Sequence, residues 1–267
     1  MYQFTEDCCI GIEHIDAEHK QLFAMINEGM DLLKGDEKMA YAGAKSLIPS
    51  LRRYAALHFA HEEEYMESIH DRELALQKEE HRQFAQYVNN FDLDALQENH
   101  AREALDNLLQ YLARWLYHHI LGSDMMIGYN LDEGEEDAFA FSDKYKTGIQ
   151  LVDDEHRRLF EIIKETNDAV QAELVHDKFD LILDIINELK DYTILHFKDE
   201  ETYMEKINYE GLPAQRLAHE AFVEKLKLIN LDEVDDNQQE YLEDLIEFLL
   251  GWLSTHILKM DKKIPVK

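Results

Sequence analysis

The feature that most constrains the fold of this chain is an internal duplication. Three segments of the first half return in the second half in the same order. They are GIEHIDAEHKQLF (11–23) with GIQLVDDEHRRLF (148–160), YAALHFAHEEEYME (54–67) with YTILHFKDEETYME (192–205), and LARWLYHHILGSD (112–124) with LLGWLSTHILKMD (249–261). Self-similarity at one long period is the signature of a repeated structural unit. The sequence therefore predicts two similar domains in tandem.

The boundary between the domains is predicted to fall in GYNLDEGEEDAF (128–139), because glycines and clustered acids favour a solvated linker. We expect one domain at residues 1–130, an acidic linker at 131–140 and a second domain at 141–267. The chain has 267 residues, which suits two small domains, and 45% of them are hydrophobic, which is enough for packed cores.

Each half contains four amphipathic stretches with helical periodicity. The chain has only three prolines and ten glycines, which favours helices over many short strands. The expected helices lie near 17–35, 41–69, 73–91 and 100–123, and near 154–174, 178–206, 212–230 and 237–260. Turn signals such as KGDEK (34–38) and YEGLP (209–213) separate them, and short connections favour antiparallel neighbours. The predicted fold class is all-α, with two up-down-up-down four-helix bundles.

Charge and cysteine content limit the classes of partner. The 27 Lys and Arg face 57 Asp and Glu, a formal net charge of −30 that nucleic-acid phosphates or an anionic membrane would repel. No apolar run approaches the roughly 18 residues of a membrane span, and the start MYQFTEDCCIG lacks the apolar segment of a signal peptide. Cys8 and Cys9 are adjacent, which rules out an ordinary disulfide framework. We therefore expect a cytoplasmic protein.

Polar residues on otherwise apolar helix faces recur in both halves. The repeated pairs are His19/His156, His58/His196, Glu62/Glu200, Gln77/Gln215, His81/His219, His119/His256 and Asp124/Asp261. Buried polar groups cost free energy unless they find partners, so a set drawn from every helix of a bundle is expected to partner itself. His58 and Glu62 are four residues apart and share one helix face. Inward histidines and carboxylates in a bundle core suit one or two divalent metals.

The spacing of His119 and Asp124 is unusual for two residues of one site. They are five residues apart, about 140° around an ideal helix at ~100° per residue. Both face one site only if the helix bulges or its last turn deforms. The second half keeps the same spacing in His256 and Asp261, which argues against accident.

The ordered motifs IDxxH, HFxxEE, HxxF and WLxxHI with a following Asp resemble the bacterial hemerythrins, over nearly all of both halves. The resemblance implies a non-haem di-iron centre, oxo- or hydroxo-bridged, in each bundle, with O₂ as a reversible ligand. By position it assigns His19 and His58 to one iron, His81 and His119 to the other, and Glu62 and Asp124 to the bridges. In the second domain the corresponding residues are His156 with His196, His219 with His256, and Glu200 with Asp261.

The third helix departs from the family pattern. The family has H-x-x-x-H there, whereas this chain has QKEEH (77–81) and QRLAH (215–219). Gln77 and Gln215 thus replace one histidine of each site, leaving four histidines and two carboxylates. Glutamine oxygen is a weaker ligand than imidazole and can yield its place to water. This ligand count is similar to that of the iron-centre repair and nitric-oxide-response relatives.

Two classes of function remain open at this point. The resemblance favours an oxygen carrier, store or sensor that is not an enzyme. The glutamines favour a di-iron enzyme or repair factor that handles nitric oxide or peroxide, and the acidic surface also suits iron storage. No output domain follows either bundle, so a sensor would act through a separate protein partner.

Overall fold

The structure is a computed structural model that describes residues 2–93, 96–128, 139–171, 179–228 and 238–267. The chain divides into two compact units, Met1–Gly128 and Tyr129–Lys267. Each unit is described below by itself. Most of the acidic linker expected at 131–140 lies outside the described residues.

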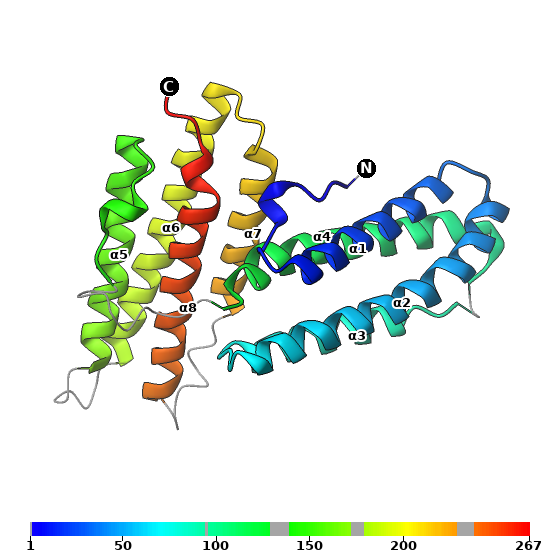
Figure 1. The fold of residues 1–267 in the computed structure, drawn as a ribbon, viewed down its shortest axis with the longest axis horizontal. Coiled ribbons are helices and arrows are strands. Elements are labelled where there is room, and N and C mark those ends of the chain that lie inside the picture. The colour runs from blue at the N-terminus through cyan, green and yellow to red at the C-terminus, as the bar shows by residue number, and fades with distance from the viewer. Residues whose placement is uncertain (1, 94–95, 129–138, 172–178, 229–237) are drawn as a thin grey trace. The chain divides into compact units, whose positions relative to one another are not determined.

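The first unit is a bundle of four α-helices (Figure 1). They are α1 (Glu13–Leu32), α2 (Glu37–Ser68), α3 (Leu74–Asn89) and α4 (Ala101–Gly122). Helix α2 packs against the other three helices, and α1 also packs against α4. The Asp36 side chain starts α2 by accepting a hydrogen bond from the Met39 N–H at 2.8 Å, which satisfies one of the free amides at the helix start.

The second unit repeats this arrangement with α5 (Gln150–Gln171), α6 (Phe179–Ile207), α7 (Leu212–Leu228) and α8 (Gln238–Lys259). Helix α6 packs against α5 and α7, and α5 packs against α8. The described residues contain no strand. The prediction of an all-α protein with two four-helix bundles in tandem is therefore confirmed.

The helix limits expected from periodicity differ from the observed limits by a few residues. The largest differences are at the starts of α1, α2 and α5, where the helix begins before the apolar pattern does. Each first turn places only one apolar residue in the core, namely Ile15, Ala40 and Val152, and a single residue does not show a helical period. The expected limits at 174, 178, 230 and 237 lie outside the described residues.

The aspartate of the repeated IDxxH motif fastens the chain at the start of the first helix of each bundle. Asp16 accepts hydrogen bonds from the Ile10 N–H at 2.8 Å and the Gly11 N–H at 3.1 Å. Asp153 accepts from the Thr147 N–H at 2.7 Å and the Gly148 N–H at 3.1 Å. The two glycines have φ of 93° and 86°, a region that glycine adopts without a steric penalty. This motif residue is therefore structural and braces the turn.

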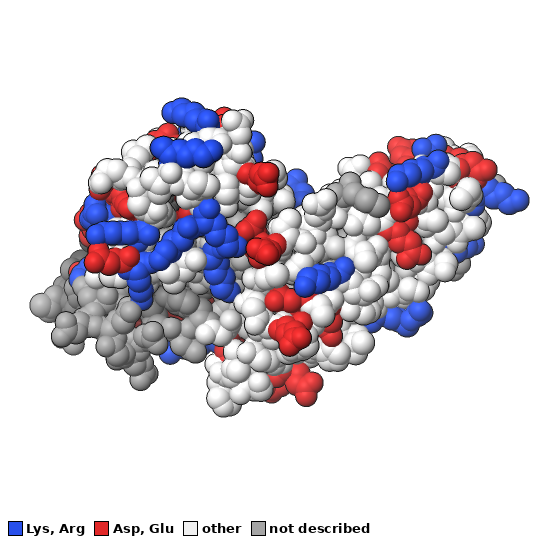
Figure 2. All heavy atoms as spheres, turned by 45° about the horizontal axis from the view of Figure 1, so that its top comes forward, with Lys and Arg blue, Asp and Glu red and all other residues white. Residues whose placement is uncertain are grey.

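Acidic and basic side chains are interspersed on the surface, and some of them form ion pairs. Acidic and basic side chains alternate over the face of the molecule in Figure 2. Exposed pairs such as Lys34 with Asp31 (2.6 Å) and Arg82 with Glu79 (2.6 Å) lie three residues apart on their helices. Exposed pairs of this kind contribute little to stability, because solvent screens the charges. In the described part of the chain, no helix combines the length and apolarity required to cross a bilayer.

Candidate metal centre

A break at the end of α4 brings Asp124 into the core of the first bundle. The α-helix ends at Gly122, Ser123 leaves the helical conformation (φ −123°, ψ −58°), and a 3₁₀ turn covers Asp124–Met126. The turn places Asp124 Oδ1 3.1 Å from His119 Nε2, with Asp124 fully buried. The five-residue spacing is thus accommodated by ending the α-helix, not by a π-bulge.

The second bundle contains the same break. Helix α8 ends at Lys259, Met260 has φ −118° and ψ −59°, and a 3₁₀ turn covers Asp261–Lys263. Asp261 Oδ1 lies 3.1 Å from His256 Nε2. Because the two halves share this local geometry, the deformation is a property of the repeated motif.

Four predicted site residues of the first bundle, all histidines, converge around the Glu62 carboxylate. Glu62 forms one compact group with His19 and His58 and a second group with His81 and His119, and all five are buried. Within each group the nitrogen and oxygen atoms that face inward lie within 4.8 Å of one another. Glu62 Oε1 lies 3.3 Å from His19 Nε2, and Oε2 lies 3.3 Å from His81 Nε2. Glu62 thus faces histidines from both groups.

Asp124 also lies between the two groups of histidines. Its Oδ2 lies 3.3 Å from His19 Nε2, whereas its Oδ1 faces His119 Nε2 at 3.1 Å. The two imidazoles of the second group approach each other, with His81 Nε2 2.9 Å from His119 Nε2. One oxygen toward each group is the placement that a bridging carboxylate requires.

The second bundle reproduces the cluster around Glu200. The two groups are His156, His196 and Glu200, and Glu200, His219 and His256, all buried. Asp261 Oδ2 lies 3.4 Å from His156 Nε2, while Oδ1 faces His256. The structure therefore brings together all the histidines and carboxylates that the sequence singled out, in two separate clusters.

The glutamines Gln77 and Gln215 also face these clusters. Gln77 Nε2 donates a hydrogen bond to Asp124 Oδ1 at 3.2 Å, and Gln215 Nε2 donates to Asp261 Oδ1 at 3.0 Å. Both side chains are 1% exposed, and neither Oε1 has a hydrogen-bond partner among the described residues. The amide nitrogen therefore holds the aspartate, and the carbonyl oxygen remains available as a weak ligand.

The inward-facing atoms of both clusters fit a pair of cations. Buried atoms that have no hydrogen-bond partner within the described chain include the Nε2 of His19, His58, His156 and His196, both carboxylate oxygens of Glu62 and Glu200, and Oδ2 of Asp124 and Asp261. Leaving buried polar atoms unpaired costs about 1–3 kcal/mol each, so a native chain retains them for a reason. Imidazole nitrogens and carboxylate oxygens are the donors of bundle di-iron sites.

The protonation of the clusters reflects burial and close pairing. Burial opposes charge on His19, but the facing carboxylates of Asp124 and Glu62 raise its pKa to about 9. Burial, with the nearby Asp261 carboxylate, raises the pKa of Glu200 to about 8. A metal requires neutral imidazoles and ionised carboxylates, so cation binding has to displace any proton that these groups hold.

Carboxylates outside the predicted set hold the far nitrogens of the histidines. Glu18 accepts from His58 Nδ1 at 3.0 Å, and its counterpart Glu155 accepts from His196 Nδ1 at 2.9 Å. In the same way Glu63 accepts from His81 Nδ1, and Glu201 accepts from His219 Nδ1, each at 2.9 Å. Such contacts fix the ring and leave Nε2 facing a metal. The sequence signal for these residues was their repetition beside the histidines, at GIEHIDAEH and HFAHEE.

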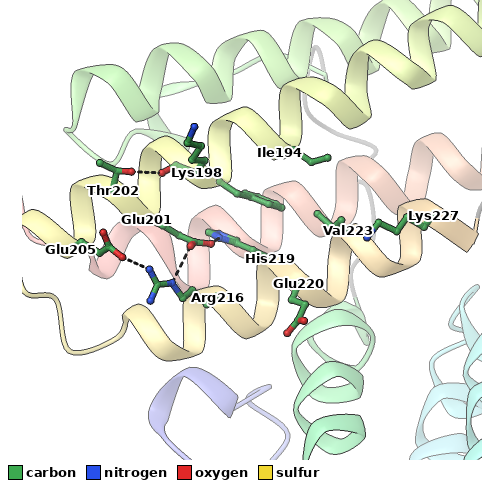
Figure 3. A pocket seen from close by; sticks show the side chains of 11 residues that line it. Ile194, Lys198, Glu201, Thr202, Glu205, Arg216, His219, Glu220, Val223 and Lys227 are labelled. Atoms are coloured by element: carbon green, nitrogen blue, oxygen red, sulfur yellow. Dashed lines mark hydrogen bonds and ion pairs between the residues drawn. The ribbon is translucent and has the colours of Figure 1, made fainter.

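The carboxylate behind His219, Glu201, is half-buried and lines a groove of about 730 Å³ between α6 and α7. Figure 3 shows Arg216 between Glu201 and Glu205, with His219 beside Glu201. Arg216 Nε donates to Glu201 Oε2 at 3.0 Å, and its Nη2 donates to Glu205. A hydrogen-bonded chain thus links a histidine of the second cluster to the protein surface.

Aromatic rings cover the histidines of the third and fourth helices. The Phe59 ring stacks on His81 with centroids 4.0 Å apart, and Trp115 stacks on His119 at 4.3 Å. Phe197 and Trp252 repeat these contacts on His219 and His256 at 3.8 and 4.4 Å. The repeated aromatics are therefore packing residues, and they pack against the histidines of the cluster.

With this geometry established, comparison with known proteins identifies the domains. The sequence model described as the Hemerythrin HHE cation binding domain matches residues 10–128 and again residues 147–264. The chain belongs to the hemerythrin family. Each hemerythrin domain therefore contains one of the two clusters.

Curated relatives each match about one domain. A bacteriohemerythrin of Clostridium acetobutylicum is 38% identical over 125 residues, which is 47% of this chain and 97% of that protein. A bacteriohemerythrin of Pseudomonas aeruginosa is 34% identical over 122 residues, 45% of this chain and 75% of that protein. A myohemerythrin of Sipunculus nudus is 28% identical over 135 residues, 49% of this chain and 94% of that protein. No solved structure gave a significant match.

Proposed function

We propose that this chain is a tandem di-iron O₂-binding protein, with a pair of irons in each hemerythrin domain. The observation that carries the proposal is the convergence of unpartnered, buried imidazole and carboxylate atoms in both clusters. When bound, the iron pair would supply a reversible binding position for O₂. The proposed ligands are His19, His58, Glu62, His81, His119 and Asp124 in the first domain, and His156, His196, Glu200, His219, His256 and Asp261 in the second.

The side chains around each site have distinct tasks in this proposal. Glu62 and Asp124 each present oxygens to both groups of histidines and would hold the two metals between them. The glutamates behind the histidines keep the ring nitrogens oriented. The burial of the cluster excludes water, which favours a small neutral ligand over bulk solvent.

The cellular setting follows from charge and cysteine chemistry. Neither Cys8 nor Cys9 forms a disulfide within the described residues, which suits the reducing cytoplasm. The net charge of −30 disfavours nucleic acid and anionic membranes as partners. We propose O₂ as the diffusible ligand, and a separate protein partner if binding is to be signalled.

The glutamines favour a second candidate function. Gln77 and Gln215 offer at most a neutral oxygen where the family pattern has imidazole. A weakly held position on one iron suits an enzyme or repair factor that binds nitric oxide or peroxide there. Iron storage is a further alternative, supported only by the acidic composition.

The decisive experiment is to reduce the iron-loaded chain without oxygen, admit air, and then return the sample to argon. A visible absorption band that appears with O₂ and disappears under argon is expected for a carrier, store or sensor. Irreversible bleaching with loss of iron would contradict it. Turnover of peroxide or nitric oxide by the reduced chain would instead favour the second function.

A further inference from the structure

The two centres differ in the carboxylates that hold their histidines. In the first domain Glu80 Oε2 accepts hydrogen bonds from His119 Nδ1 at 2.9 Å and from Ser123 Oγ at 2.7 Å. The corresponding positions in the second domain are Ala218 and Met260. Neither alanine nor methionine can accept from His256 Nδ1 as a carboxylate does.

A second difference concerns the glutamate behind the third-helix histidine. Glu201, behind His219, also accepts from Arg216, whose positive charge offsets that of the carboxylate. The position of Arg216 is taken in the first domain by Lys78, and no ion pair joins Lys78 to Glu63 among the described residues. The carboxylate behind His81 thus lacks the arginine that its counterpart has.

Both differences act in the same direction. A carboxylate that accepts from the far nitrogen of an imidazole makes its metal-facing nitrogen a stronger donor. In the first domain His58, His81 and His119 each have such a carboxylate, whereas in the second only His196 and His219 do, in the described part of the chain. A stronger donor set stabilises ferric iron over ferrous iron and lowers the reduction potential.

We propose that Glu80 is a positioning residue that makes the two centres inequivalent, with the first domain holding the centre of lower reduction potential. The couple is ferrous to ferric, one electron per iron, exchanged in the test with an added mediator dye. The inference rests on the proposed function only in requiring that both domains bind iron. The second domain would then remain ferrous, and able to bind O₂, under conditions that oxidise the first.

The test is a redox titration of the iron-loaded full chain under argon, followed by its absorption spectrum. Glu80→Gln removes the charge but keeps an acceptor oxygen, and Glu80→Ala removes both. The matched control is Glu79→Gln, since Glu79 is the adjacent residue and, within the described residues, pairs with the exposed side chains of Arg82 and Gln83. We expect two unequal potentials in the wild-type chain and a rise of the lower one in both Glu80 variants. A tenfold change in the ferric-to-ferrous ratio corresponds to about 59 mV for one electron.

A reciprocal variant distinguishes the effect of this hydrogen bond from a general loss of structure. Ala218→Glu with Met260→Ser should give His256 Nδ1 a carboxylate acceptor and lower the reduction potential of the second centre. Circular dichroism should show unchanged helicity. Release of ferric iron to a chelator should also quicken by roughly ten- to hundredfold in Glu80→Ala, from one centre only. A single reduction potential for both centres would overturn the inference, and so would potentials that are unchanged in the Glu80 variants. Two potentials without reversible O₂ binding would instead overturn only the proposed function, and a chain that holds no iron would overturn both.

Discussion

The amide nitrogen of Gln77 donates to Asp124 Oδ1 at 3.2 Å, and the amide oxygen of the same side chain has no partner among the described residues. A histidine at this position would present a ring nitrogen to a metal. The glutamine instead fastens the carboxylate that faces both groups of histidines. Gln215 and Asp261 repeat the arrangement at 3.0 Å, so both clusters contain a glutamine that holds the aspartate.

Replacing both glutamines with histidine should strengthen oxygen binding. Gln77→His with Gln215→His supplies an imidazole, a stronger donor to iron than an amide oxygen. We expect the wild type to give a short-lived oxygenated form and more than one azide-binding mode, and the double variant to give a longer-lived form and a single mode. Absorption spectroscopy of decay in air and of azide titrations provides both measurements.

A histidine added elsewhere on α3 provides the control for that experiment. Gln83 is exposed, and its side chain donates a hydrogen bond to Glu79. Gln83→His should therefore leave the lifetime of the oxygenated form and the azide-binding modes at their wild-type values. If the double variant also leaves them unchanged, neither glutamine influences the irons, and the enzyme-like alternative loses its main support.

Glu62→Ala should empty or split the first site and spare the second. Glu62 belongs to both groups of histidines, so its loss removes an oxygen from each. The iron content should fall to about half, because ligand loss in one bundle leaves the other intact. Glu64→Ala is the matched control, since Glu64 lies two residues away on the exposed face of α2. Equal iron content in Glu62→Ala and Glu64→Ala would refute the bridging role.

The fully loaded chain should contain about four irons, two for each cluster of four histidines and two carboxylates. Elemental analysis of protein expressed with ample iron gives the value. Glu200→Ala should lower it to about half, as Glu62→Ala does, and the combined variant should bind almost none. A wild-type value near two that reconstitution does not raise would mean single irons or an empty domain.

Asp16→Ala should destabilise the first bundle. Asp16 is buried and accepts from the amides of Ile10 and Gly11, which would be left unpaired. The expected loss is about 1–3 kcal/mol of unfolding free energy, measured by urea denaturation of the metal-free chain. Asp31→Ala removes an aspartate that is 52% exposed on the same helix and should change it by less than about 0.5 kcal/mol. Similar losses in the two variants would contradict the bracing role.

The sequence by itself determined the duplication, the helical class and the identities of the clustered residues. Helical periodicity and the spacing of His58 and Glu62 are local properties, which a single helix expresses without its neighbours. The repeat strengthened the prediction of a site, since polar residues that recur at matching positions on apolar faces indicate a shared role. Glu18 and Glu63 carried the same signal through their counterparts Glu155 and Glu201.

Only the tertiary structure decided how these residues meet. The orientation of the Gln77 amide depends on its hydrogen bond to Asp124, a residue that follows the end of α4. Asp124 in turn reaches the core only because the chain leaves the helical conformation at Ser123. Glu80 had no repeated counterpart, so nothing in the sequence distinguished it from a solvent-facing acid. Its role follows from the packing of α3 against the end of α4, which places its carboxylate on His119. Contacts between separate helices depend on where each backbone lies, and no local pattern records that.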